Sequence, residues 1–228
     1  MIRIIFLLTY VTFCLVSPAQ NRLSQLRHVG TFKSIEAGKG INVTLIEGNR
    51  EKVQVEIENG KLKDVITKVK KGTLIIKMKT KFYKGVAVRA FVTYRSLQSI
   101  TAGVGSYVDN EGTLHAGELT LKAGSDASIV LDIKTKLLNA TASAAKIEVV
   151  GSADYQEVNA NTGARYVADQ LISMNGTVKA NTGASVWVNI TDKLEAKANS
   201  GGDILYNGSP KELITETSLG GKISQNEE

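Results

Sequence analysis

The five residues Ala-Asn-Thr-Gly-Ala occur twice in this chain, at 160–164 and again at 180–184. They belong to a repeat of 18 to 22 residues that begins near Leu97 and continues almost to the end of the sequence. When the repeats are aligned, one column contains only glycine and alanine: Gly105, Ala127, Ala145, Ala164, Ala184, Gly202 and Gly221. A repeat of this length is too short to bury a hydrophobic face alone, so neighbouring repeats are expected to stack.

Apolar and polar residues alternate after this small column. The position two residues later is apolar in every repeat: Tyr107, Ile129, Ile147, Tyr166, Val186, Ile204 and Ile223. Such alternation indicates a strand with one buried face. A second strand begins eight residues before the small column, at Leu97, Leu119, Leu137, Gln156, Gly176, Leu194 and Leu213. Glycine-containing segments between the two strands, such as Asn-Thr-Gly, are typical of tight corners.

The sequence therefore predicts an all-β protein, with a β-solenoid of about seven short coils over residues 97–224. We expect Asn161, Asn181 and Asn199 to stack at the corners and to form hydrogen bonds along the rod. Residues 29–96 form an N-terminal β region, with strands predicted near 31–35, 41–48, 52–59, 65–71, 73–80 and 86–94. This region either continues the solenoid with irregular coils or covers its open end. Residues 20–28 are expected to be a linker and residues 225–228 a tail.

Several segments in this order resemble one known family. They are Phe32-x-x-Ile35, Gly40-Ile41-Asn42 at the start of a strand, a Gly-Thr-Leu-x-Ile hairpin segment over 72–76, and the repeated Gly/Ala corners. Together they resemble the GIN domain, the head domain of a group of auto-transporter adhesins common in secreted Bacteroidetes proteins. The resemblance covers nearly the whole chain after the first nineteen residues. It implies a right-handed parallel β-helix and an extracytoplasmic location, and it implies no ligand and no catalytic residue.

Residues 1–19 have the features of a secretory signal peptide. A charge at Arg3 precedes an apolar run from Ile4 to Val16, which is too short to span a bilayer, and small residues allow cleavage after Ala19. Cleavage would remove Cys14, the only cysteine, and would lower the net charge from +6 to +5. We therefore expect a secreted, periplasmic or outer-surface protein without disulfides, without a transmembrane segment after cleavage, and with a mild basicity that suits anionic glycans or lipid head groups.

Residues suited to catalysis are scarce in this sequence. The two histidines, His28 and His115, have no patterned partner, and no HExxH, GxSxG or P-loop motif occurs. Aspartates such as Asp126, Asp169 and Asp203 fall at different places in their coils. We expect no catalytic residue, no metal and no cofactor. The alternative is a carbohydrate-active β-helix enzyme, which would need two carboxylates and a base within about 6 Å of one another.

One outward column of the predicted coils is unusually apolar. It contains Val108, Val130, Glu148, Val167, Trp187 and Leu205, and Arg165 and Lys146 flank it. Stacking would bring these residues onto neighbouring rungs, with the only tryptophan of the chain near the middle. We predict a contact patch of Val130, Val167, Trp187, Leu205 and Arg165, because exposed apolar stripes and aromatic residues often mark interaction sites. The alternatives are that the N-terminal region covers the stripe, or that a second copy of the chain does.

A second candidate surface is rich in lysine. Lys68, Lys70, Lys77, Lys79 and Lys81 alternate with apolar residues in the predicted hairpin, so they are expected to share its solvent face. Such lysines either keep an exposed strand soluble or bind an anionic partner. Nucleic acid is not expected, because aromatic residues are not interleaved on this face. The sequence thus favours a non-enzymatic, adhesin-like interaction protein that binds a surface glycan or an envelope protein, with homo-oligomers as a further possibility.

Overall fold

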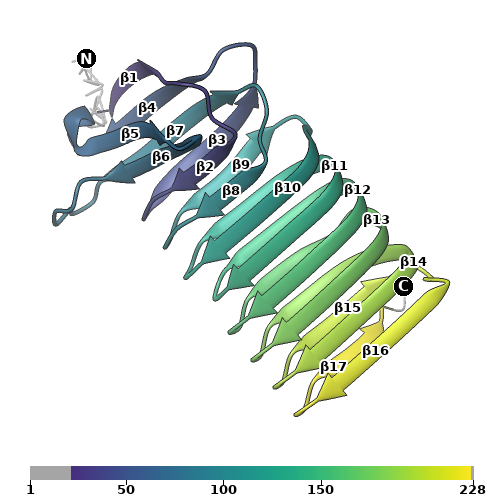
Figure 1. Ribbon diagram of the computed structural model, residues 1–228. Helices are drawn as coiled ribbons and strands as arrows, with labels where there is room; N and C mark the ends of the chain where they lie inside the picture. Colours follow the sequence, from purple (N-terminus) through teal and green to yellow (C-terminus); the bar gives the residue numbers. More distant parts are fainter. Residues whose placement is uncertain (1–21, 227–228) are drawn as a thin grey trace, which may run out of the picture.

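The computed structural model describes residues 22–226, so the predicted signal peptide lies outside the described part of the chain. The described residues form an elongated rod of stacked strands, with the N-terminal strands at one end and the C-terminal strands at the other (Figure 1). The only helical element in this range is a single 3-10 turn, η1 (Leu62–Asp64). The predicted all-β solenoid of about seven turns is confirmed.

The central coils are long strands that bend around the rod. They are β10 (Leu114–Gly124), β11 (Ser128–Ser143), β12 (Lys146–Asn161), β13 (Arg165–Asn181) and β14 (Ser185–Asn199). Each strand pairs in parallel with the next along almost its whole length. The last coil is divided between β15 (Asp203–Asn207), β16 (Glu212–Ser218) and β17 (Lys222–Gln225): β15 and β16 pair with the two halves of β14, and β17 pairs with β15.

Residues before the repeats continue the same stack. The coil formed by β2 (Ser34–Ala37) and β3 (Ile41–Glu47) pairs in parallel with β8 (Ser99–Ala102) and β9 (Tyr107–Glu111). On its other side, β2 pairs with β6 (Thr73–Met78) and β3 pairs with β7 (Ala87–Tyr94), also in parallel. The end of the rod is antiparallel: β5 (Val65–Lys70) pairs with β6, β4 (Lys52–Glu58) pairs with β7, and β1 (Arg22–His28) pairs with β4.

Two sheets therefore run the length of the rod. We call the one that starts at β1 and ends at β17 the first sheet; it contains the first halves of β11 to β14. The second sheet starts at β5, ends at β16 and contains their second halves. The buried side chains of both sheets belong to one hydrophobic cluster that extends from Phe32 to Tyr206. Residues 29–96 and the repeats thus share a single core.

The strand registers place the predicted small column inside the rod. Ala127, Ala145, Ala164, Ala184 and Gly202 are buried and follow one another from coil to coil. At Gly202 an added Cβ would lie 2.3 Å from the backbone oxygen of Ala180, so the coils approach too closely there for a larger side chain.

The prediction of Gly105 as the first member of this column was wrong, because the register places Ser106 there instead. Ser106 is 1% exposed, and its hydroxyl donates a hydrogen bond of 2.6 Å to the backbone oxygen of Gly103. A serine whose hydroxyl is satisfied locally fits a column of alanines. For the same reason of register, Leu138 rather than Leu137 occupies the inward column that contains Gln156.

The repeated Asn-Thr-Gly-Ala segment forms the tight corner between the two sheets. At Thr182 and Gly183 the φ angles are +53° and +71°, and the Ala184 amide donates to the Asn181 carbonyl at 3.2 Å. Two consecutive positive φ angles are the pattern of a type I′ turn, which explains the glycine. The predicted asparagine ladder is confirmed: Asn181 Nδ2 donates to Asn161 Oδ1, and Asn199 Nδ2 donates to Asn181 Oδ1, each at 3.1 Å.

Residues 22–28, which the sequence analysis assigned to a linker, form β1 instead. Arg27 holds this strand in place: its guanidinium donates to the backbone oxygens of Leu62 and Val65, each at 2.7 Å. Arg22 adds a hydrogen bond of 2.7 Å to Glu58 on β4. The segment was not recognised as a strand because all but one of its residues are exposed and its apolar alternation is weak.

Candidate binding surfaces

The predicted Trp187 stripe lies on the outer side of the first sheet. Val167, Trp187 and Leu205 are directly in register on β13, β14 and β15, and all three side chains are partly exposed. The Cζ atom of Arg165 lies 5.1 Å from the centroid of the Trp187 ring, a cation–π arrangement. These four of the five residues predicted for the contact patch are neighbours on this sheet, and we call them the tryptophan patch.

Two members of the predicted stripe belong elsewhere. Val108 is fully buried in register with Ile129, and Asp109 lies beside Val130 in its place. The cause is the same one-residue offset that places Ser106 rather than Gly105 in the small column. Val130 is partly exposed, but Glu148 separates it from Val167, and Glu148 forms an ion pair of 2.6 Å with Lys146. The continuous apolar surface is therefore shorter than predicted.

The described part of the N-terminal region does not cover the tryptophan patch. Strands β1 to β7 pair only with one another and with β8 and β9, at the far end of the rod from β13 to β15 (Figure 1). Within residues 22–226, the patch is therefore an open surface on a flat sheet. This removes the alternative that the N-terminal strands bury it.

The predicted lysine surface lies at the N-terminal end of the second sheet. Lys68 and Lys70 on β5 and Lys77 on β6 are exposed and project from the same side of the antiparallel pair. Lys79 is also exposed and follows β6. Lys81 instead forms an ion pair of 2.9 Å with Asp64, a carboxylate that is 6% exposed. The hydrogen bond from Lys81 lowers the pKa of Asp64 and raises the pKa of Lys81. Lys81 thus has a structural partner, whereas the other four lysines form no ion pair within the described residues.

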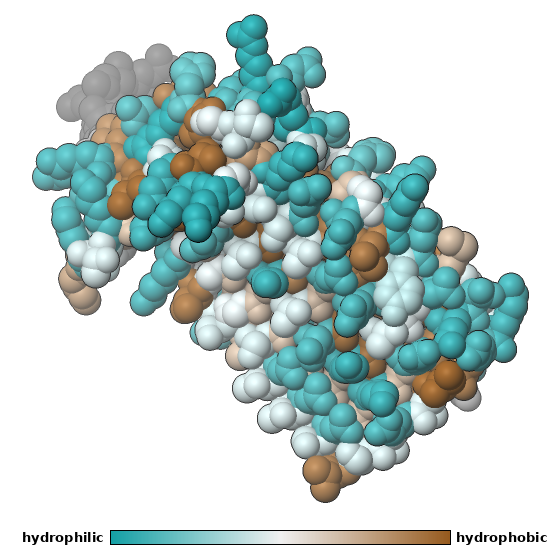
Figure 2. Space-filling view, in the orientation of Figure 1, coloured by the Kyte–Doolittle hydropathy of each residue, from teal (hydrophilic) through white to brown (hydrophobic). Residues whose placement is uncertain are grey.

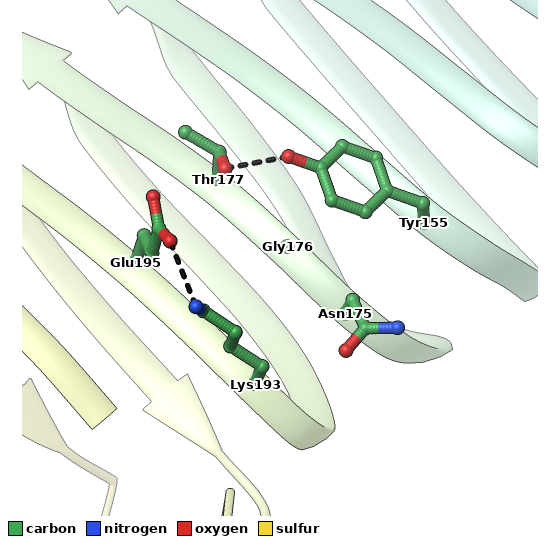
Figure 3. A pocket seen from close by; sticks show the side chains of 6 residues that line it. All are labelled: Tyr155, Asn175, Gly176, Thr177, Lys193 and Glu195. Atoms are coloured by element: carbon green, nitrogen blue, oxygen red, sulfur yellow. Dashed lines mark hydrogen bonds and ion pairs between the residues drawn. The ribbon is translucent and has the colours of Figure 1, made fainter. Parts of the chain in front are cut away.

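A pocket of about 340 Å³ lies on the outer side of the second sheet, and the sequence analysis did not predict it. Tyr155 and Thr177 line one side, where their hydroxyls are joined by a hydrogen bond of 2.6 Å, and Lys193 and Glu195 line the other (Figure 3). Gly176 forms part of the lining between them. The sequence did contain one sign of an irregularity here, because Gln156 and Gly176 interrupt a column in which the other repeats have leucine.

The pocket brings one lysine close to two carboxylates. Lys193 Nζ lies 3.2 Å from Glu195 Oε1 and 2.9 Å from Glu212 Oε1. The hydrogen bonds that Lys193 donates to these carboxylates raise its pKa, with Glu212 as the larger cause. A general base needs a pKa lowered toward neutrality, so this lysine remains protonated and the cluster has the electrostatics of a structural ion pair. The distance criterion for the enzyme alternative is met in this cluster, while the raised pKa of Lys193 argues against its use as a general base.

Other surface features are small. Ile172 and Met174 on β13 are 58% and 50% exposed, and periodicity gave no warning of them because the register shifts at this bend. Figure 2 shows one long face of the rod, where hydrophilic residues dominate and hydrophobic residues form separate patches.

Within residues 22–226 no three His, Cys, Asp or Glu side chains are grouped so that they could hold a metal ion. The same range contains no helix with the length and hydrophobicity of a membrane span.

The fold and its open surfaces define a class of protein, a β-solenoid that presents flat sheet faces along a rod. The family model described as "Putative auto-transporter adhesin, head GIN domain" matches residues 31–210, which is most of the chain. The chain belongs to this family. The family resemblance of the sequence motifs is thereby confirmed.

Several solved structures have the same fold as this chain. A putative adhesin from Bacteroides fragilis NCTC 9343 is 18% identical with a TM-score of 0.82, and the alignment covers 92% of this chain and 99% of that one. A putative adhesin from Parabacteroides distasonis ATCC 8503 is 16% identical with a TM-score of 0.71, covering 91% and 98%. A protein of the same organism described as a putative lipid binding protein is 16% identical with a TM-score of 0.70, also covering 91% and 98%.

These identities establish a shared fold and nothing more specific. No curated protein sequence matches this chain. The family supports an adhesin-like function in general terms.

Proposed function

We propose that this protein is a non-enzymatic, adhesin-like binding protein of the cell envelope or surface, and that the tryptophan patch binds an acidic surface glycan. The observation that carries the proposal is the partly exposed Trp187 with Arg165 at 5.1 Å, set between two aliphatic side chains on a flat sheet. Aromatic residues and arginine are the residue types in which binding energy is most often concentrated.

The chemistry of the patch suits a sugar that carries carboxylate or sulfate groups. A pyranose ring offers C–H groups that pack on the indole and on Val167 or Leu205, while its acidic substituent accepts hydrogen bonds from Arg165. The guanidinium presents a planar fork of donors that matches a carboxylate in two places. The net charge of +5 after cleavage of residues 1–19 favours the approach of an anionic polymer along the rod. The lysines Lys68, Lys70, Lys77 and Lys79 provide a second, weaker site for the same polymer.

A surface location supports this proposal. Adhesin-like family membership and the predicted signal peptide both support export to the periplasm or outer surface. A surface glycan is then an accessible ligand. A protein partner on the same patch is the competing outcome of the experiment that follows.

A glycan array probed with residues 20–228 tests the proposal. We expect binding to uronic-acid or sulfated glycans, and we expect Trp187→Asp to reduce it at least about tenfold, since the loss of one anchoring aromatic residue costs more than about 1.4 kcal/mol. Light scattering on the same samples monitors the oligomeric state. Unchanged glycan and cell-surface binding by the Trp187→Asp variant would remove the patch from consideration.

Tyr155→Ser is the matched control, because it removes an aromatic side chain from the pocket on the other sheet. This variant should retain full glycan binding. If Tyr155→Ser abolishes binding and Trp187→Asp does not, the glycan site lies in the pocket. If the protein binds whole cells but no glycan on the array, and protease treatment of the cells removes this binding, the partner is a protein. Release of reducing sugars during incubation would instead support the enzyme alternative.

A further inference from the structure

The C-terminal end of the rod is open within the described residues. All seven residues of β16 are exposed, and β16 pairs only with β14, so its other edge has no strand beside it. Leu213 is in register with the fully buried Leu194, yet Leu213 is 44% exposed. The interior column of the solenoid thus continues to this end and is left uncovered there. Unpaired strand edges of this kind are templates for pairing with another chain.

The N-terminal end presents complementary edges. Within residues 22–226, the second sheet ends in β5 and the first sheet ends in β1, and each of these strands pairs on one side only. Leu23 on β1 is in register with the buried Ile57 but is itself 41% exposed, so apolar interior surface is also available at this end. The Arg27 guanidinium bridges β1 to η1 and β5 and keeps the two edges in fixed positions.

The two ends differ in charge: the N-terminal end is strongly basic, whereas the edge strand at the other end carries two glutamates that are paired with lysines of β14. Residues 61–84 contain nine lysines and one aspartate, and Lys68 and Lys70 on the edge strand β5 form no ion pair within the described residues. The edge strand β16 carries Glu212 and Glu216 on its outer side. Lys193 binds Oε1 of Glu212 and Lys197 binds Oε2 of Glu216, so each carboxylate has a second oxygen free to accept from another lysine.

We propose that copies of this chain associate head to tail, with the β16 end of one copy against the β5 end of the next. In this arrangement one of the two lysines Lys68 and Lys70 can lie directly opposite a glutamate of β16, and the other reaches the second glutamate only diagonally, because the lysines are two residues apart and Glu212 and Glu216 are four. Tail-to-tail pairing would place Glu212 and Glu216 opposite the same glutamates of the second copy, and head-to-head pairing would place lysines opposite lysines. Electrostatics therefore favour head-to-tail pairing. Because two different surfaces meet, the contact does not close into a dimer and gives chains of rods.

The most exposed large hydrophobic residues support the same arrangement. Phe82, in the loop between β6 and β7, is 92% exposed, and Leu219, at the corner between β16 and β17, is 82% exposed. The β6–β7 loop and the β16–β17 corner lie at opposite ends of the rod (Figure 1). Head-to-tail contact would bring both toward the same junction, where burial would remove apolar surface from water.

Analytical ultracentrifugation of residues 20–228 over a concentration series tests the proposal. We expect the average mass to rise continuously past the dimer, and the association to weaken with added salt because screening reduces the attraction of charges. The double variant Lys68→Glu/Lys70→Glu and the double variant Glu212→Lys/Glu216→Lys should each require about tenfold higher concentration to associate, which corresponds to the loss of two ion pairs. An equimolar mixture of the two variants should regain association, since each altered end then meets its complement.

Mid-rod variants on the same sheet serve as controls. Lys122→Glu and Glu157→Lys reverse one charge each, half the change of either double variant, at exposed positions away from both ends, and should leave association unchanged. The variant Glu212→Gln/Glu216→Gln controls for the possibility that the Glu→Lys substitutions only destabilise the last coil. Thermal melts followed by circular dichroism measure any such loss of stability directly. A strictly monomeric wild type, a closed dimer, or a mixture of reversed variants that stays monomeric would overturn the proposal. Glycan binding by Trp187 is measured separately and does not depend on this outcome.

Discussion

A buried polar network inside the rod gives a sharp test of the structure. Tyr166, Gln156 and Ser173 are each fully buried. The Tyr166 hydroxyl donates to Gln156 Oε1 at 2.9 Å, and Gln156 Nε2 donates to Ser173 Oγ at 2.9 Å. Burial raises the pKa of Tyr166 far above its ordinary value, so its hydroxyl keeps its proton and remains a donor.

Tyr166→Phe removes only the hydroxyl and leaves Gln156 Oε1 buried without a donor. An unsatisfied buried acceptor costs about 1–3 kcal/mol, so we expect the free energy of unfolding to fall by that amount. Urea denaturation monitored by circular dichroism measures the change, and the slope with urea should not change because the exposed area is the same. Tyr155→Phe is the control: that hydroxyl is partly exposed and water replaces its partner, so the loss should stay below about 1 kcal/mol.

The double variant Tyr166→Phe/Gln156→Leu completes the argument. Leucine at this position would lie in the inward column between Leu138 and the small Gly176. Gln156→Leu should lower the free energy of unfolding less in the Tyr166→Phe background than in the wild type, because its hydrogen-bond partner is already gone. A double-mutant cycle reports this difference as a coupling energy. A Tyr166→Phe loss no larger than that of Tyr155→Phe, or no coupling in the cycle, would refute the proposed network.

Three further predictions concern stability. Asn181→Ala removes both ladder hydrogen bonds of a central asparagine and should lower the free energy of unfolding by about 1–2 kcal/mol in urea melts. Gly202→Ala should lower the thermal midpoint, whereas Gly201→Asn, at a corner with positive φ, should be tolerated because asparagine accepts that conformation. The pKa of Asp64 is lowered in the folded state, so the stability that the Asp64 carboxylate contributes is fully present above its unfolded-state pKa of about 4 and is lost as the pH falls through its folded-state pKa. Lys81→Met should therefore lower the free energy of unfolding at neutral pH. The difference from the wild type should shrink when the melts are repeated in acid.

The sequence was sufficient to predict the repeat, because stacking requires the same residue sizes in each coil. The Gly/Ala column, the alternate apolar column and the asparagine ladder follow from that requirement, and all three are found. The errors were local. Ser106 and Leu138 were misplaced by one residue because a neighbouring residue had a similar size or hydrophobicity, and a shift of one residue exchanges inside for outside.

The candidate surfaces were harder to predict than the fold. The apolar run of Val167, Trp187 and Leu205 was visible because it interrupts a polar column. The pocket was not, since Tyr155, Thr177 and Lys193 are ordinary outward residues and only the neighbouring coils bring them together. The open ends of the rod were equally invisible, because a periodic pattern does not mark which copy of the repeat has no neighbour.

Fluorescence of Trp187 tests the central claim most directly, since it is the only tryptophan in the sequence. The protein should be titrated with polygalacturonate, an acidic polysaccharide, and with dextran, a neutral one. Our account predicts a saturable change in emission with polygalacturonate that is lost in Arg165→Ala, and no change with dextran. Equal responses to both polymers, or binding of polygalacturonate detected by calorimetry without any change in Trp187 emission, would contradict it.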